Sequence, residues 1–171
     1  MSCLKGKYLN LIIMSLLNQI KTEIKEIWGR VDQIPILNAI LSFCEGDFLL
    51  SALIIQLCYW KDRSRLANGW IAKSSTDWEQ EIGIKEKTLK RKVKLLTQLG
   101  LVKTKLKKFA GAPTVHYRLE EDMLLLMLRC YLKFHYPTVS QIQSQFSQNG
   151  PIELVKMSKW IETFCQKEFG Q

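Results

Sequence analysis

The chain has 171 residues, 47% of them hydrophobic and 24% charged, which excludes wholesale disorder and corresponds to about one globular domain. Its five scattered cysteines without a CxxC pair and its two histidines lead us to expect neither disulfides nor a zinc site, in a reducing, cytoplasmic compartment. The net charge of +9 is concentrated in one segment. Residues 85–118 hold eleven of the 25 Lys and Arg residues but only one of the 16 Asp and Glu residues. Such a segment favours a polyanionic partner, most often nucleic acid.

An amphipathic helix is expected from about Tyr8 to Trp28. Its apolar residues recur with the 3.6-residue helical period and fall along one stripe. The stripe includes Leu9, Ile12, Ile13, Leu16, Leu17, Ile20, Ile24 and Ile27. Lysines precede the apolar run at 11–17, as in a signal peptide, but no small-x-small cleavage site follows and the run is too short to span a membrane. We therefore expect a packing or dimerisation helix and no targeting segment.

Three more helices and a short strand follow between residues 29 and 83. A short helix is expected over about 36–44, and a strongly apolar helix, buried on most sides, over 48–60. Residues 69–72 are a candidate short strand. Thr76 and Glu79 have the spacing of a capping box, which predicts the start of a helix, and Gly83 supplies the left-handed residue that ends it.

The next helix begins almost at once, near Lys85, and ends at Leu99 before Gly100. Two helices this close together predict a helix-turn-helix. The apolar residues of the second helix lie on one side, whereas four cations lie within an arc of about 100° on the opposite side. These cations are Lys87, Lys90, Arg91 and Lys94. Lys85 and Thr88 lie near the N-terminal end, where such helices usually contact base edges.

A basic β-hairpin is expected directly after this helix. Residues 102–107 and 114–119 alternate between apolar and polar side chains, the pattern of half-buried strands, and residues 109–113 form the connecting turn. The polar face and the tip carry the candidate DNA contacts Lys103, Lys105, Lys107, Lys108, Thr114 and His116. We expect His116 to be exposed on this face, and no carboxylate lies near the lysines in sequence.

Several short motifs occur in a recognisable order between about Leu50 and Leu119. They are Tyr59-Trp60, Gly69-Trp70, Trp78, Ile82-Gly83-Ile84, Arg91, Leu99-Gly100-Leu101-Val102, Gly111-Ala112-Pro113-Thr114 and Tyr117-Arg118. This stretch resembles the winged-helix domain of phage and plasmid replication-initiation proteins and of related DNA-binding regulators. It covers about 70 of the 171 residues. Lys85 departs from the pattern, since a small hydroxyl residue is more usual there.

The resemblance implies a mainly α fold with a small β-hairpin, in which a winged helix-turn-helix core is flanked by N- and C-terminal helices. We accordingly expect an N-terminal helical segment (1–46), a DNA-binding segment (47–119) and a C-terminal helical segment (120–171). Residues 123–132 are nearly all apolar, and a last amphipathic helix follows Pro151. The apolar residues at 9–20 and 124–128 exceed what one small winged helix needs to cover, which predicts a two-fold symmetric homodimer.

Enzyme function is not expected. The chain has no GxxxxGK[ST], GxGxxG, HExxH or GxSxG motif, and its acidic pairs are typical of a helix face and a helix start. We therefore expect no catalytic residue, cofactor, metal, membrane or small-molecule substrate. Of the five tryptophans, expected mainly in the core, only Trp70 is placed to lie exposed beside lysines, as stacking on unpaired bases requires.

Three functions remain open. The first is a repressor-like, dimeric regulator of transcription that binds double-stranded DNA. The second is a replication initiator or accessory protein of a phage, plasmid or other mobile element. The third is a protein–protein interaction module that has lost DNA binding. The 50 or so residues after Leu119 are short for a helicase-loading domain, which favours the regulator, and the concentrated basic segment disfavours the interaction module.

Overall fold

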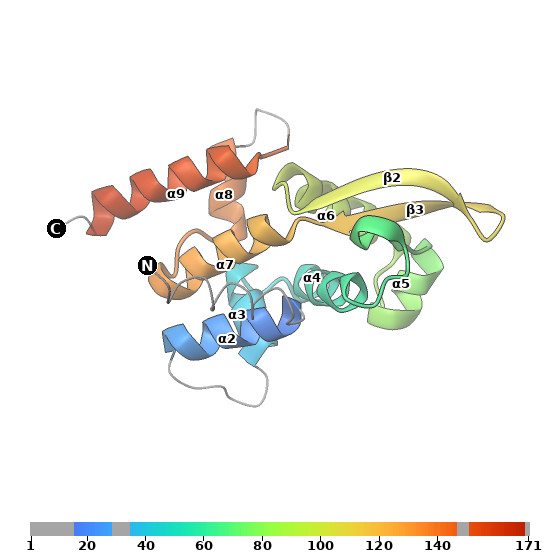
Figure 1. Ribbon diagram of the computed structural model, residues 1–171, viewed down its shortest axis with the longest axis horizontal. Coiled ribbons are helices and arrows are strands. Elements are labelled where there is room, and N and C mark those ends of the chain that lie inside the picture. The colour runs from blue at the N-terminus through green and yellow to red at the C-terminus, as the bar shows by residue number, and fades with distance from the viewer. Residues whose placement is uncertain (1–15, 29–34, 147–150, 170–171) are drawn as a thin grey trace, which may run out of the picture.

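The computed structural model describes residues 16–28, 35–146 and 151–169 (Figure 1). The described chain is mainly helical and has a small three-stranded antiparallel sheet. Its order is β1 (Ile71–Ala72), β3 (Ala112–Leu119), β2 (Val102–Phe109). The expected combination of many helices with one hairpin is thus confirmed. The first part of the helix predicted from Tyr8 lies outside the described residues, and the described part begins at Leu16.

Helix α4 (Phe48–Lys61) is the centre of the helical part. It begins at Asp47, whose Oδ1 accepts a hydrogen bond from the Leu50 N–H at 3.0 Å. Its apolar residues point in all directions, and those at 50, 53, 54, 57 and 58 are buried. They can all be buried because α4 is surrounded by α2 (Leu16–Trp28), α3 (Pro35–Phe43), β1 and β3. The predicted buried helix is therefore confirmed.

Two short helices follow α4 and pack against each other. After a 3-10 turn (Ala67–Gly69) and β1 (Ile71–Ala72), α5 runs over Ser75–Ile82 and α6 over Glu86–Gln98. Gly83 ends α5 in the left-handed conformation, with φ of 69°, as predicted. The predicted capping box is wrong. Ser74 and Asp77 form it, two residues before Thr76 and Glu79, because the helix begins earlier than expected.

The hairpin consists of β2 (Val102–Phe109) and β3 (Ala112–Leu119), paired in register along their whole length. Strand β1 adds two residues beside β3, at Tyr117 and His116. The face towards the helices is buried near its base, at Val102, Tyr117 and Leu119. Figure 1 shows the hairpin extending past α5 and α6, at the end of the molecule opposite α9 (Leu154–Phe169).

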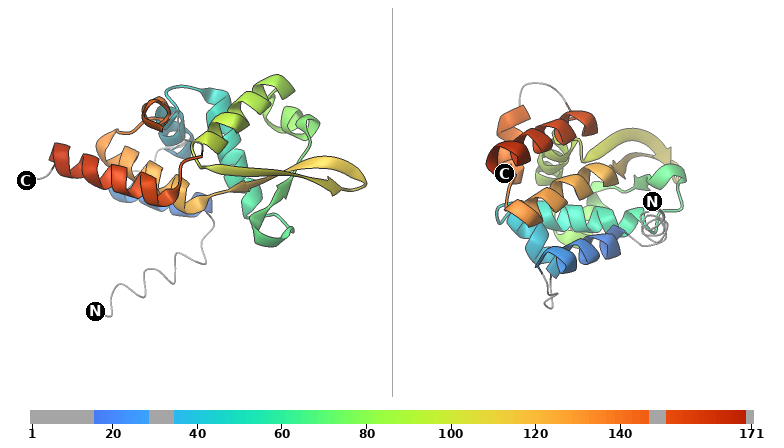
Figure 2. Two further views of the ribbon diagram at one scale, coloured as in Figure 1. Left: turned by 90° about the horizontal axis from the view of Figure 1, so that it is seen from above. Right: turned by 60° about the vertical axis from the view of Figure 1, so that its left-hand side comes forward.

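The outer half of the hairpin departs from the prediction of two half-buried strands. Leu106 is 69% exposed and its register partner Val115 is 36% exposed. Their alternation follows the predicted period, but the strands continue beyond the helices that would cover them. The left view of Figure 2 agrees with this, since the hairpin tip projects freely beyond the helices there.

The C-terminal helices α7 (Glu121–Phe134), α8 (Val139–Phe146) and α9 (Leu154–Phe169) close the fold on the other side. Leu124, Met127 and Leu128 are buried within this one chain, against a core that also includes residues of α2, α3 and α4. The expectation that residues 124–128 leave an excess of apolar surface is therefore wrong, because α2, α3 and α9 cover α7.

The described residues give no indication of a membrane span, a disulfide or a metal site. Within residues 16–28, 35–146 and 151–169, no helix is long and apolar enough to cross a bilayer, and no three potential metal ligands cluster. Cys44, Cys58 and Cys130 are buried free thiols. Burial raises the pKa of Cys44 to about 12, which keeps this thiol protonated and unreactive at neutral pH.

Candidate nucleic-acid interface

The exposed side of α6 carries the cations predicted for it. Lys87, Lys90, Arg91 and Lys94 are all exposed, whereas Leu89 and Leu96 on the opposite side are buried in the core. Lys90 forms an ion pair with Glu86 one turn earlier, at 2.6 Å. The other three cations form no ion pair within the part of the chain that the structure describes. They leave a row of positive charge without a carboxylate partner.

Neighbouring elements hold α6 at its N-terminus and at its middle. Lys85 occupies the N-cap without a side-chain cap, and its ammonium pairs with Glu79 of α5. Thr88 in the first turn is partly buried. Lys92 pairs with Asp47, the residue that caps α4, so an ion pair ties the middle of α6 to the start of α4, while α6 packs against α5 and β2. Lys85, a candidate DNA contact, is thus already in contact with a carboxylate.

The hairpin lysines differ in their surroundings. Lys103 Nζ lies 3.1 Å from Glu120 Oε2, and Arg118 Nε lies 2.9 Å from Glu120 Oε1. No carboxylate lies near Lys103 in sequence, but the fold brings it to Glu120, which directly follows the return strand. Lys107 and Lys108 are exposed and have no ion pair with any described residue. Thr114 is partly buried, and its hydroxyl donates to the Ala112 carbonyl at 3.2 Å.

Lys105 contacts an aromatic ring instead of a carboxylate. Its Nζ lies 3.5 Å from the centroid of the Trp70 ring, and the Arg118 guanidinium lies 5.3 Å from the same centroid. Partial desolvation and the nearby cations Lys107 and Arg118 lower the pKa of Lys105 below its usual value. Three cations thus lie close together on this face of the sheet, an arrangement that an anion would relieve.

His116 was predicted to be exposed, and this prediction is wrong. It is only 5% exposed, since β1 lies beside it and the Phe109 ring packs against it at a centroid distance of 6.1 Å. Its Nδ1 lies 3.0 Å from the Thr114 carbonyl oxygen. The alternation of the strand placed His116 on the correct face, but its cover comes from side chains that alternation does not describe. Direct contact of this ring with a phosphate is disfavoured.

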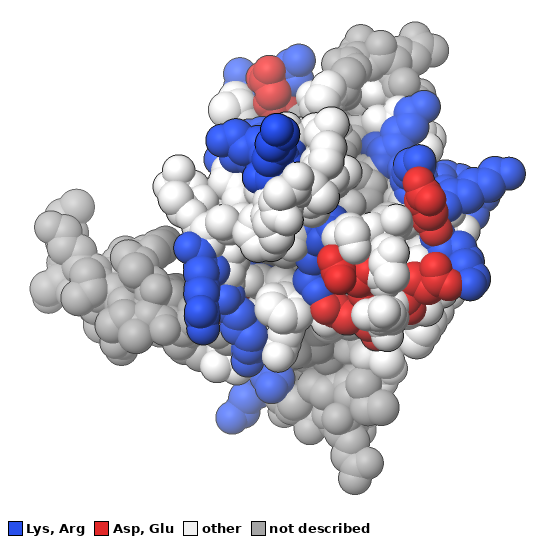
Figure 3. Space-filling view, turned by 90° about the vertical axis from the view of Figure 1, so that its right-hand side faces the viewer, with Lys and Arg blue, Asp and Glu red and all other residues white. Residues whose placement is uncertain are grey.

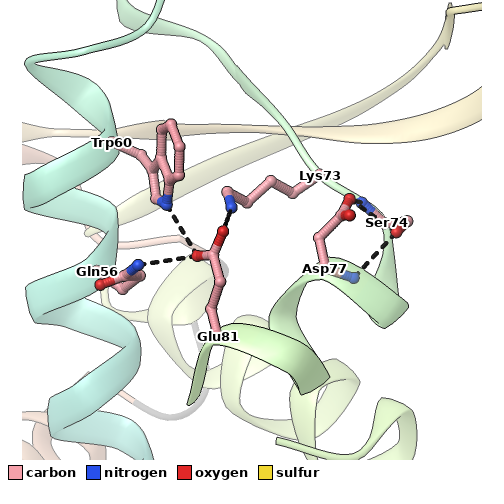
Figure 4. Close-up of polar contacts among 6 residues, drawn as sticks. All are labelled: Gln56, Trp60, Lys73, Ser74, Asp77 and Glu81. Carbon is pink, nitrogen blue, oxygen red and sulfur yellow. Dashed lines mark hydrogen bonds and ion pairs between the residues drawn. The ribbon is translucent and has the colours of Figure 1, made fainter. Parts of the chain in front are cut away.

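A polar cluster that the sequence did not reveal holds α4, β1 and α5 together (Figure 4). Glu81 accepts hydrogen bonds from Gln56 Nε2 and Trp60 Nε1, both at 2.8 Å, and pairs with the nearly buried Lys73. Burial raises the pKa of Glu81, but these donors lower it more, so the carboxyl titrates below its usual value. The Lys73 ammonium also lies 4.0 Å from the centre of the Trp60 ring.

The surface charges do not form one continuous basic patch. Figure 3 looks at the end of the molecule from which the hairpin projects, and shows several groups of Lys and Arg with a cluster of Asp and Glu among them. Helix α5 contributes acidic residues next to the cations of α6. Within residues 85–118, the cations without a carboxylate partner therefore divide into one group on α6 and another on the hairpin. Comparisons with protein-family models, curated proteins and solved structures found no match.

Proposed function

We propose that this protein binds double-stranded DNA through a winged helix-turn-helix and acts as a regulator of transcription. The observation that carries the proposal is the row Lys87, Arg91 and Lys94, exposed and unpaired within the described chain, on a helix whose opposite side is buried. The second helix of a closely spaced pair is the element that enters the major groove in helix-turn-helix proteins. Directly after it comes a hairpin with further unpaired cations.

The two groups of cations suit different tasks. Arg91 lies on the exposed side of α6, and an arginine fork can bond the O6 and N7 atoms of guanine together. Lys107 and Lys108 lie on a projecting hairpin, and lysine is a flexible point charge suited to phosphate. In this proposal α6 reads the sequence and the hairpin tip grips the backbone. The fixed position of α6 on α4 removes the need to order the helix on binding.

The first test is the affinity for a DNA site recovered from random fragments. Arg91→Ala should weaken binding to that site by about 1–3 kcal/mol and relax the preference at one base pair. Lys156→Ala, which removes an exposed cation from α9, is the matched control and should leave both unchanged. An unaltered sequence preference in the Arg91 variant would remove α6 from the role of reader.

A second test uses the salt dependence of binding. Replacing Lys107 and Lys108 by alanine should weaken binding to specific and random duplexes about equally. The slope of log K against log salt should become shallower by roughly two units, at about 0.9 per phosphate contact. Titrations at several salt concentrations measure both effects. A variant that loses only specific binding, at an unchanged slope, would contradict phosphate contact by the tip.

The recovered sites also separate a regulator from a replication initiator. A dimer that selects an inverted repeat, with half-sites about one turn of DNA apart, supports the regulator. A monomer that selects tandem direct repeats supports the initiator. Light scattering on the same preparation measures the molar mass in solution and so tests the predicted homodimer.

A further inference from the structure

The face of the sheet that points away from the helices carries aromatic rings among its cations. Trp70 is partly buried at one end of this face and Phe109 is 45% exposed at the other, with the His116 ring beside Phe109. Lys105, Lys107 and Arg118 lie on the same face. Phosphate contacts in duplex DNA would use these cations but would leave the rings without a function. We call Trp70, Lys105, Lys107, Phe109 and Arg118 the outer sheet face.

Register and contacts agree that these residues share one side of the sheet. Lys105 pairs with His116, and Phe109 pairs with Ala112, so the side chains of each pair point the same way. Lys105 Nζ lies 3.5 Å from the centroid of the Trp70 ring, and the Phe109 and His116 ring centroids are 6.1 Å apart. These contacts place the Trp70 and Phe109 rings on the same side of the sheet as Lys105 and His116. Four residues separate Lys105 from Phe109, or about 13 Å along a strand, a length comparable to about four stacked nucleotides.

We propose that the outer sheet face binds an unpaired DNA strand, with bases stacked on Trp70 and Phe109 and phosphates on Lys105, Lys107 and Arg118. The proposal takes DNA as the partner from the proposed function and adds a second mode of binding, on a surface that shares only Lys107 with the duplex contacts proposed for the hairpin tip. Aromatic rings interleaved with cations are the arrangement by which proteins hold single strands without reading their sequence. A duplex hides the faces of its bases in the stack, so it could use only the cations.

The present position of Lys105 over Trp70 is compatible with this mode. Stacking of a base on an aromatic ring is more favourable than an exposed cation–π contact, so an incoming base can displace the ammonium. The displaced Lys105 remains beside the strand, where a phosphate would relieve its repulsion with Lys107 and Arg118. Neither Lys105 nor Lys107 has a carboxylate partner in the described chain that would compete.

The experiment measures binding of fluorescein-labelled dT20 to the full chain by anisotropy. Trp70→Leu should weaken binding by about 5- to 150-fold, the usual effect of losing one stacked base. Phe109→Ala, which alters an exposed side chain at the tip and leaves the core intact, should act in the same direction. Trp70→Phe keeps a ring and should restore most of the affinity. Thermal unfolding of each variant shows that it is folded.

Tyr59→Leu is the matched control. Tyr59 is also a partly exposed aromatic residue under a cation, with Arg63 3.8 Å from its ring centre, but it belongs to α4 and not to the sheet. This variant should bind dT20 within about twofold of the wild-type affinity. A 20-mer of abasic sites has the same phosphates as dT20 but no bases, and it should bind the protein far more weakly than dT20 does. Equal binding of the abasic strand would show that only charge matters and would overturn the proposal.

The outcomes separate this proposal from the proposed function. Duplex binding that depends on Arg91, together with wild-type dT20 binding in the Trp70 and Phe109 variants, overturns the single-strand site alone. Trp70-dependent binding of dT20 without duplex binding overturns the proposed function alone. If Arg91→Ala weakens dT20 binding as much as Trp70→Leu does, the strand lies on α6 and the outer sheet face is the wrong surface. A chain that binds neither DNA overturns both.

Discussion

Gly100 is the residue with the least tolerance for a side chain among the described glycines. It joins α6 to β2 with φ of 71°, a left-handed conformation that costs other residues energy. A Cβ there would lie 2.1 Å from the Ile152 carbonyl oxygen. Ile152 in turn donates its N–H to Gln98 at 3.0 Å. One small residue thus allows the chain before α9 to meet the end of α6.

Gly100→Ala should therefore destabilise the protein by clearly more than the roughly 1–2 kcal/mol of a left-handed alanine. Gly111→Ala in the hairpin turn is the matched control, since its φ is 85° and a Cβ there meets nothing within 4 Å. It should cost only the conformational part. Urea unfolding of both variants gives the comparison, and equal losses would mean that the chain near Ile152 moves aside without cost.

At the scale of single residues, the sequence predicted on which side of a helix or strand a residue lies better than it predicted which other residues that side chain contacts. The helical period correctly separated buried Leu89 and Leu96 from exposed Arg91 on α6. The strand period put His116 on the correct face but could not show its burial, because Phe109 and β1 cover it through contacts distant in sequence. In the same way it could not show that Lys103 meets Glu120, a pair 17 residues apart.

At the scale of elements, boundaries were the main errors, and the start of α5 shows why. Ser74 with Asp77 and Thr76 with Glu79 both fit a capping box, so local sequence alone does not choose between them. The observed start agrees with where β1 ends and with the bond between Lys73 and Glu81, which join the strand to the helix. Those contacts depend on the tertiary structure.

The cluster around Glu81 makes the joint of α4, β1 and α5 sensitive to acid. The pKa of Glu81 is lowered in the folded protein, so its contribution to stability is complete above the unfolded value near 4.5 and is lost as the pH falls through the lower, folded value. Glu81→Gln should reduce stability at pH 7 and lose less further stability between about pH 5 and pH 3. Urea unfolding at these pH values measures both effects. Parallel pH profiles for the two proteins would show that other carboxyls dominate.

At the scale of the whole molecule, the three segments expected from the sequence share one hydrophobic core. Leu16 and Ile24 of α2, Leu53 of α4 and Leu124 of α7 are all fully buried in it. The sequence indicated that each helix has an apolar side, but not that these sides meet in one chain instead of between two. An amphipathic pattern shows which side of a helix must be buried, but it does not show which other element, of the same chain or of a second copy, packs against that side.

Because the core is shared, the protein should unfold in one cooperative transition. Far-ultraviolet circular dichroism reports all helices, whereas fluorescence is dominated by tryptophans, of which Trp78 is fully buried between α5 and the sheet. The two signals should give the same midpoint in urea. Two separated midpoints would instead mean that residues 47–119 fold as an independent unit.

If the proposed function holds, the free outer half of the hairpin divides recognition into a fixed part on α6 and an adaptable part on the hairpin. Within the described residues, the part of the hairpin beyond β1 has no third strand beside it, and an isolated two-stranded ribbon is marginally stable. Helix α6 is already ordered when it meets a ligand, so the ligand must fit the shape of the helix from the start. The ribbon can adjust its twist after the first encounter, and ordering it then consumes part of the energy of its contacts. The hairpin should consequently tolerate ligands of varied shape, while α6 discriminates among them.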